Sequence, residues 1–179
     1  MTTNQRRHSV ILGEGDPINV TRITDQLYLG AIIYDLDTFK RFIADEGIDA
    51  IVSVWDERML ALDKLGVSHE NYMYIYISDN EQANIMQHFD AAYRFLNQKI
   101  DIEKKKVYVH CHAGLSRSPT LVLCYLMRQR RIPLEEAYRF VSRKRSIRPN
   151  NSFWRQLQMY ESNVNIMHDA HASVDNRRK

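Results

Sequence analysis

Two residues that could act together on a phosphate group stand six positions apart in the segment YVHCHAGLSRSPT. Cys111 closes a β-branched and aromatic run, and Arg117 follows it after a short loop of mostly small residues. Gly114 allows this loop to curl tightly, and a helix is predicted from Ser118 onward. A tight loop that leads into a helix turns backbone N–H groups inward, and the helix adds its positive end. The segment therefore predicts an anion site.

The donors of such a site would also activate the cysteine. An arginine guanidinium presents a planar fork that suits two phosphate oxygens. Cysteines beside helix N-termini or cations have pKa values of about 3.5–7.5 instead of about 8.5. The chemistry that uses both a thiolate and a bound phosphate is phosphoryl transfer to sulfur, followed by hydrolysis of the thiophosphate. The alternative is structural, with Cys111 as a small buried residue and Arg117 as a surface side chain.

The loop must be positioned by the elements around it, and strands are predicted to alternate with helices along the chain. This alternation predicts an α/β fold with a central, mostly parallel, twisted sheet flanked by helices. In such sheets ligands bind beyond the carboxyl ends of the strands, which is where residues 111–118 stand. The predicted strands are 23–30, 49–55, 72–77 and 105–111, and the predicted helices are 36–47, 81–99, 118–131 and two shorter ones around 134–141 and 153–160.

Length and composition predict one intracellular domain. The 179 residues are enough for a single core, and the net charge of +3 is mild. We expect a flexible N-terminal arm (1–20), a catalytic domain (21–163) and a polar C-terminal tail (164–179), with the arm as a candidate for oligomer contacts. Two cysteines give no disulfide framework, and we find neither a signal peptide nor an apolar run of about 18 residues. The cytoplasm is the expected location, with the nucleus as a second one.

The segment HCHAGLSRS resembles the His-Cys-x5-Arg-Ser/Thr signature of the protein tyrosine phosphatase superfamily, in the form found in dual-specificity phosphatases. The segments ITDQLYLG and SIRPNNSFWRQL also match, so the resemblance covers about residues 20–163. It implies the cysteine phosphatase fold, with Cys111 as nucleophile and Ser118 as a hydrogen-bond donor to the departing thiolate. It also implies that the phosphate is held by the loop residues His112, Ala113, Gly114, Leu115, Ser116 and Arg117.

The resemblance further implies a general acid on a separate loop, because the leaving oxygen must be protonated as the P–O bond breaks. Asp79 in YIYISDNEQ, 32 residues before Cys111, fits this role. Alternatively, Asp79 would cap the predicted helix 81–99. Glu81 is the fallback acid, and Asp90, inside that helix, is a poorer candidate.

Other residues are given supporting roles by the same resemblance. His110 would orient the loop, Arg148 would border the site, and Asn150 would be architectural. Cys124 is interpreted as part of the apolar core. No cofactor or metal is expected, because the two cysteines lack metal-ligand spacing.

The expected substrates are phosphotyrosine and phosphoserine or phosphothreonine in proteins, because no recognition loop that would deepen the pocket is found. Doubly phosphorylated kinase segments are candidate partners, since eight basic and two acidic residues give positions 128–148 a charge of +6. A solvated helix face explains this cluster equally well. The alternatives are an RNA 5′-triphosphatase, a phosphoinositide phosphatase, which the lysine-free loop disfavours, and a phospho-binding scaffold. Nucleic acid is otherwise not expected as a partner.

Overall fold

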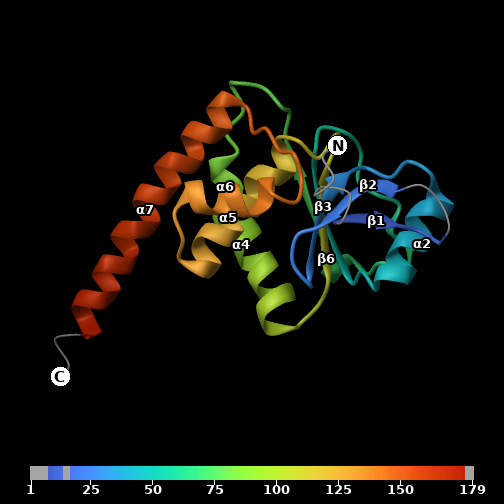
Figure 1. Cartoon of the computed structure of the whole chain (residues 1–179), viewed down its shortest axis with the longest axis horizontal. Coiled ribbons are helices and arrows are strands. Elements are labelled where there is room, and N and C mark those ends of the chain that lie inside the picture. The colour runs from blue at the N-terminus through green and yellow to red at the C-terminus, as the bar shows by residue number, and fades with distance from the viewer. Residues whose placement is uncertain (1–7, 14–16, 176–179) are drawn as a thin grey trace.

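A six-stranded sheet forms the centre of the protein in a computed structural model that describes residues 8–13 and 17–175 (Figure 1). The strand order is β1-β2-β3-β6-β4-β5. The last four are parallel, whereas β1 and β2 are antiparallel additions beside β3. The predicted mostly parallel sheet is therefore confirmed. The strands are β1 (Ser9–Ile11), β2 (Pro17–Arg22), β3 (Leu27–Ala31), β4 (Ala50–Trp55), β5 (Tyr72–Tyr76) and β6 (Val107–Cys111).

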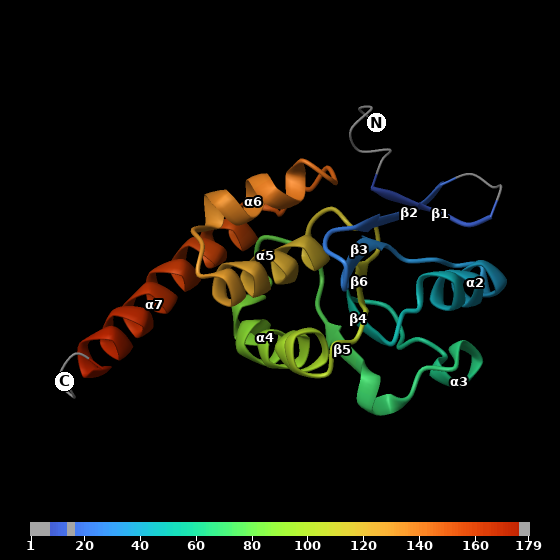
Figure 2. The same cartoon turned by 60° about the horizontal axis from the view of Figure 1, so that its bottom comes forward.

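Helices cover both faces of the sheet, which gives three layers (Figure 2). The helices α2 (Leu36–Glu46) and α3 (Leu62–Leu65) lie on one face. The other face is covered by α4 (Phe89–Leu96) and α5 (Arg117–Arg130), against which α6 (Leu134–Ser142) and α7 (Asn151–Asp175) pack. Short helical turns are η1 (His69–Asn71), η2 (Met86–His88) and the π-helical η3 (Asn97–Ile102).

Alternating side chains along the central strands divide the core in two. Leu27 and Leu29 of β3 pack in the cluster with α4 and α5, whereas Tyr28 between them packs in the cluster with Phe39 and Phe42 of α2. Every residue of β3, β4 and β6 is buried, as the continuous apolar runs predict for strands covered on both faces. Helix α5, predicted to be central, is buried from its first residue through Met127.

The prediction of a flexible arm over residues 1–20 is wrong for the two strands that lie within it. Strand β2 pairs with β3, with Val20 opposite Gly30, and β1 pairs with β2. A Cβ atom at Gly30 would lie 2.4 Å from the carbonyl oxygen of Asn19, so this close approach requires glycine. The sequence of this segment did not indicate β2, because the strand depends on its backbone pairing with β3 rather than on an apolar pattern of its own. Residues 1–7 and 14–16 of the arm lie outside the described part.

Element boundaries differ from the predictions at two further places. The predicted helix 81–99 starts only at Met86, so the residues after β5 form a loop that carries Asp79. Helix α7 continues to Asp175, so the tail predicted from residue 164 begins as helix, which projects past the other helices in Figure 1. The helix predicted over 36–47 is confirmed, with Gly47 in the left-handed conformation at its end.

Candidate active site

Cys111 lies at the carboxyl edge of the sheet, as the last residue of β6. Its side chain is almost fully buried, with the residue 2% exposed. The sulfur accepts hydrogen bonds from the backbone N–H of Gly114 at 3.2 Å and from the hydroxyl of Ser118 at 3.1 Å. Both donors would stabilise negative charge on the sulfur more than a neutral thiol. The expected contact between Ser118 and the nucleophile candidate is therefore present.

Arg117 is the first residue of α5 and is buried beside the loop. Its Nη1 donates to the Asp56 carboxylate at 2.6 Å and to the carbonyl of Ile77 at 3.0 Å. Its Nε is also buried and has no hydrogen-bond partner within the described residues. The hydrogen bond from Arg117, helped by one from Ser78, holds the pKa of Asp56 below its ordinary value.

Sequence reasoning missed Asp56, although one signal pointed to it. Asp56 directly follows β4, which neighbours β6 in the sheet, and Ile77 directly follows β5. The carboxyl ends of parallel strands meet at one edge, so polar residues at those ends converge. The sequence shows the strand ends but not the strand order, which is what brings Asp56 to Arg117.

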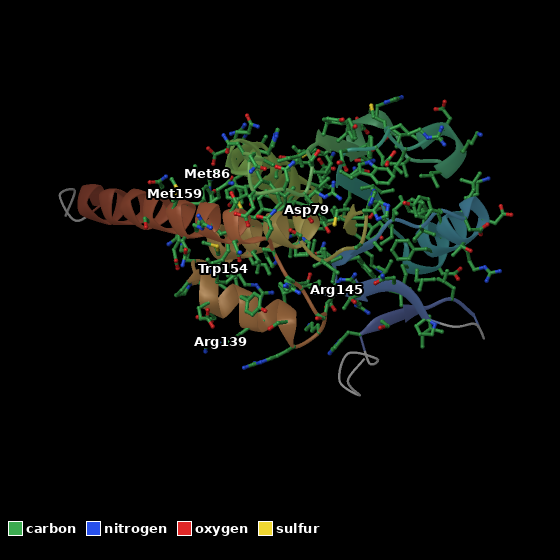
Figure 3. The ribbon with its side chains drawn as sticks, turned by 90° about the horizontal axis from the view of Figure 1, so that it is seen from above. Asp79, Met86, Arg139, Arg145, Trp154 and Met159 are labelled. Carbon is green, nitrogen blue, oxygen red and sulfur yellow. The ribbon has the colours of Figure 1, made fainter. Side chains whose placement is uncertain are left out.

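The loop between Cys111 and Arg117 is supported from behind by Arg145. Gly114 has φ +66°, and a Cβ atom there would lie 2.4 Å from both the Gly30 carbonyl carbon and the Arg145 Nη2. Arg145 donates from Nε to the Gly114 carbonyl at 2.9 Å and from Nη2 to the Ala113 carbonyl at 3.2 Å. It also reaches β2, donating to the side chains of Asn19 and Thr21. In Figure 3 it lies between the end of α6 and the β1–β2 hairpin.

This placement corrects the interpretation of positions 128–148 as a surface cluster. Arg145 is 7% exposed and fully occupied by the loop and by β2. Arg128 pairs at 2.8 Å with Asp90, which lies outside positions 128–148. Part of the formal charge of +6 is therefore buried or paired with an acidic side chain. A substrate would meet a weaker positive field than this number suggests.

Asp79 is tied to the loop rather than to a helix. Its Oδ1 accepts hydrogen bonds from the hydroxyl of Ser116 at 2.9 Å and from the side-chain amide of Asn150 at 2.8 Å. Asn150 also donates its backbone N–H to Ser116 Oγ at 3.0 Å, which closes a three-residue network. Helix capping by Asp79 is excluded, because the next helical turn begins at Met86. The architectural role expected for Asn150 takes the form of this network.

The two other acid candidates face elsewhere. The carboxylate of Glu81 lies 3.7 Å from Arg155 on α7. Asp90 is the second residue of α4 and is paired with Arg128. Of the three carboxylates considered, Asp79 is the one that contacts the loop.

His110 is buried and neutral at the end of β6. Its Nδ1 lies 3.2 Å from the Cys111 carbonyl, which can only accept, so Nδ1 carries the proton and Nε2 accepts from the Ser53 hydroxyl at 2.6 Å. Burial lowers the pKa of His110 to about 4. The ring packs edge-on against Trp55 and stacks on Tyr108. These contacts, which the sequence did not indicate, fix the ring next to Cys111, and the expected role of His110 in orienting the loop stays a prediction.

The remaining site candidates lie at the rim or in the core. Arg148 reaches the loop through its backbone, whose N–H donates to the Leu115 carbonyl at 2.6 Å, while its side chain is exposed. His112 Nε2 lies 2.8 Å from the hydroxyl of Tyr34, and the Leu115 side chain is exposed. Cys124 is fully buried in α5, where burial raises the pKa of its thiol, in agreement with a core role.

Two other kinds of feature are absent from the described residues. Among the side chains that the structure describes, which lie in 8–13 and 17–164, no three histidine, cysteine or acidic residues are grouped so that they could hold a metal ion. Across 8–13 and 17–175, no helix has both the length and the apolar character needed to cross a bilayer.

The fold and the loop together define a cysteine-based phosphatase of the protein tyrosine phosphatase superfamily. Residues 27–163 match the family "Dual specificity phosphatase, catalytic domain", and the chain belongs to this family. Its fold is shared with the solved structure of the Cydia pomonella PTP-2 phosphatase, with a TM-score of 0.74, 28% identity and coverage of 78% of this chain and 88% of that chain.

Two relatives illustrate how much of longer proteins this chain spans. It is 37% identical over 154 residues to AMV078 of Amsacta moorei entomopoxvirus, named a putative tyrosine-protein phosphatase, covering 84% of this chain and 93% of that protein. It is 36% identical over 156 residues to human dual specificity protein phosphatase 1, covering 87% of this chain but 40% of that protein. The chain thus spans nearly the whole length of the first relative and less than half of the second.

Proposed function

We propose that this chain removes phosphate from phosphotyrosine and from phosphoserine or phosphothreonine in proteins, through a cysteinyl-phosphate intermediate. The observation that carries the proposal is the loop itself. The Cys111 sulfur accepts two hydrogen bonds there, and Arg117, at the end of the loop, is the first residue of α5. A buried thiol with such donors, beside a fixed guanidinium, suits nucleophilic attack on phosphorus. Membership of the dual-specificity family supports the same reaction.

In the first step, the Cys111 thiolate attacks the phosphorus and the bond to the leaving oxygen breaks. Arg117 and the loop N–H groups stabilise the charge on the other phosphate oxygens. Asp79 gives its proton to the leaving oxygen, from a position set by Ser116 and Asn150. In the second step, water attacks the thiophosphate and Asp79 accepts its proton. Ser118 stabilises the departing thiolate, and inorganic phosphate leaves.

Phosphorylated proteins are the substrate class that we favour, with doubly phosphorylated segments as a narrower candidate. The exposed basic residues that could meet a second phosphate are Arg143 and Arg148, because Arg145 is committed to the loop. Arg148 is the better placed of the two, since its backbone contacts Leu115. The two free, buried cysteines suit a reducing compartment such as the cytoplasm or nucleus.

A phosphate-release assay tests the proposal on one preparation. The substrates are a phosphotyrosine peptide, a phosphothreonine peptide, an inositol phospholipid and an RNA with a 5′-triphosphate. We expect both peptides to be turned over with the highest kcat/KM, and Cys111→Ser to abolish release while still binding phosphopeptide. Faster turnover of the RNA or the lipid would replace the proposal with that alternative. Binding by the wild-type protein without any release would support a phospho-binding scaffold.

A further inference from the structure

A groove of about 760 Å³ lies between the segments that follow β3 and β4, and the proposed reaction leaves it without a role. We call it the flanking groove. One wall is the segment between β3 and α2, and the other is the segment from the end of β4 through α3. Its lining is mainly apolar and includes Ile33, Tyr34, Leu36, Trp55, Met59 and Leu60.

Apolar side chains are exposed to solvent in this groove to an unusual degree. Tyr34 is 72% exposed, Met59 50% and Leu36 36%. They are three of the eight large apolar side chains that are exposed in the described part of the chain. Single exposed apolar residues need no explanation, but several in one concave site mark a binding surface.

A side-chain contact links the lining of the flanking groove to the phosphate loop. The hydroxyl of Tyr34 lies 2.8 Å from Nε2 of His112, the residue after Cys111. Trp55 lines the groove and directly precedes Asp56, which holds Arg117. Asp79 contacts the loop at Ser116, near its other end. A phosphate in the loop would therefore lie beside the groove.

The charges at the groove suit an anionic peptide. Arg58 and Lys64 lie along it against Glu57, which gives a net charge of +1. All three charged side chains are exposed to solvent. Most of the binding free energy would therefore come from apolar side chains of the ligand that displace water from the apolar walls. A phosphopeptide supplies a negative charge and side chains at fixed spacing, whereas an RNA end offers no aliphatic side chain.

We propose that the flanking groove binds the substrate polypeptide beside its phosphorylated residue, and that it selects an aliphatic or aromatic side chain there. An extended chain advances about 3.3 Å per residue, so three positions on either side of the phosphoresidue reach about 10 Å along the surface. This inference rests on the proposed protein phosphatase function and adds a sequence preference to it.

The test compares matched phosphothreonine peptides that differ by alanine or leucine at each of the three positions on either side. Leucine buries more apolar surface than alanine, so we expect roughly tenfold higher kcat/KM for leucine at one position. Met59→Glu and Leu36→Glu should bring this leucine-to-alanine ratio close to one. Peptide binding to Cys111→Ser, with and without Met59→Glu, should show the same loss without relying on turnover.

Ile102→Glu is the matched control. Ile102 is 61% exposed and precedes β6, whereas Cys111 ends it, so the new charge lies at the opposite edge of the sheet. This variant should keep the wild-type ratio. Equal kcat/KM for leucine and alanine peptides in the wild-type protein would overturn the groove proposal while leaving the phosphatase function intact. Failure to hydrolyse any phosphopeptide, with turnover of an aryl phosphate, would instead overturn the proposed function.

Discussion

The carboxylate of Asp56 lies 2.6 Å from Nη1 of Arg117, so the end of β4 holds the guanidinium that begins α5. The same Nη1 donates to the carbonyl of Ile77, just beyond β5. Three neighbouring parallel strands, β6, β4 and β5, thus contribute to one arginine: β6 leads into the loop that carries it, and the other two fix its orientation. The Nε atom of Arg117 is buried and has no hydrogen-bond acceptor among the described residues.

Removing the Asp56 carboxylate should weaken phosphate binding. A hydrogen bond to a charged group is worth about 1.5–3 kcal/mol, and Asp56 is partly exposed, so we expect Asp56→Ala to lower kcat/KM for an aryl phosphate about tenfold. Steady-state kinetics and the affinity for tungstate measure the effect. Asp63→Ala, an exposed carboxylate in α3, should change neither. Unchanged tungstate affinity in Asp56→Ala would show that Arg117 does not need this partner.

Asp79→Asn should slow the reaction according to the leaving group. General acid catalysis contributes about 10²–10⁴-fold, and activated aryl oxygens hardly need it. We therefore expect a loss of that size on a phosphothreonine peptide and a much smaller loss on a nitrophenyl phosphate. Glu81→Gln, the matched control, should act like the wild type on both. Near wild-type rates of Asp79→Asn on the peptide would remove Asp79 from the mechanism.

Arg145 should stabilise the loop rather than attract substrate. Arg145→Lys keeps the charge but loses the fork that reaches the Gly114 and Ala113 carbonyls. We expect urea unfolding to show a loss of about 3 kcal/mol, together with weaker tungstate binding. Arg143→Lys, at an exposed position, should stay within about 0.5 kcal/mol of the wild type. If both variants changed only the salt dependence of peptide turnover, the surface interpretation of Arg145 would be restored.

His110 should make the fold less stable as the pH falls. Burial lowers its pKa from 6.5 to about 4, so below about pH 6.5 the unfolded chain takes up a proton that the folded chain does not. Its stabilising contribution is complete above pH 6.5 and is lost as the pH falls toward 4, by an amount on the order of 3 kcal/mol.

Urea unfolding at a series of pH values measures this slope in the wild type and in His110→Asn. Burial also lowers the pKa of His88, which adds a slope of the same sign in both proteins. The difference between the two curves therefore isolates His110. Parallel curves between pH 6.5 and 4 would contradict a neutral, buried His110.

The sequence by itself determined the loop. Cys111, Gly114, Arg117 and Ser118 fall within eight consecutive residues between a strand and a helix, so local backbone geometry brings them together. The apolar runs likewise determined the central strands, because burial on both faces leaves a continuous signal. Asp79 could be predicted because the resemblance gave its distance from the cysteine.

Only the tertiary structure decided which distant groups support that loop. Asp56 and Arg145 lie 61 and 28 residues from Arg117 in sequence. Asp56 reaches Arg117 because β4 neighbours β6, and Arg145 reaches the loop because it follows α6, which packs against α5. Strands β1 and β2 were missed for the same reason, since a short polar strand is stabilised by its partner rather than by its own pattern. Long-range pairing of this kind depends on strand order, and periodicity along the chain does not encode that order.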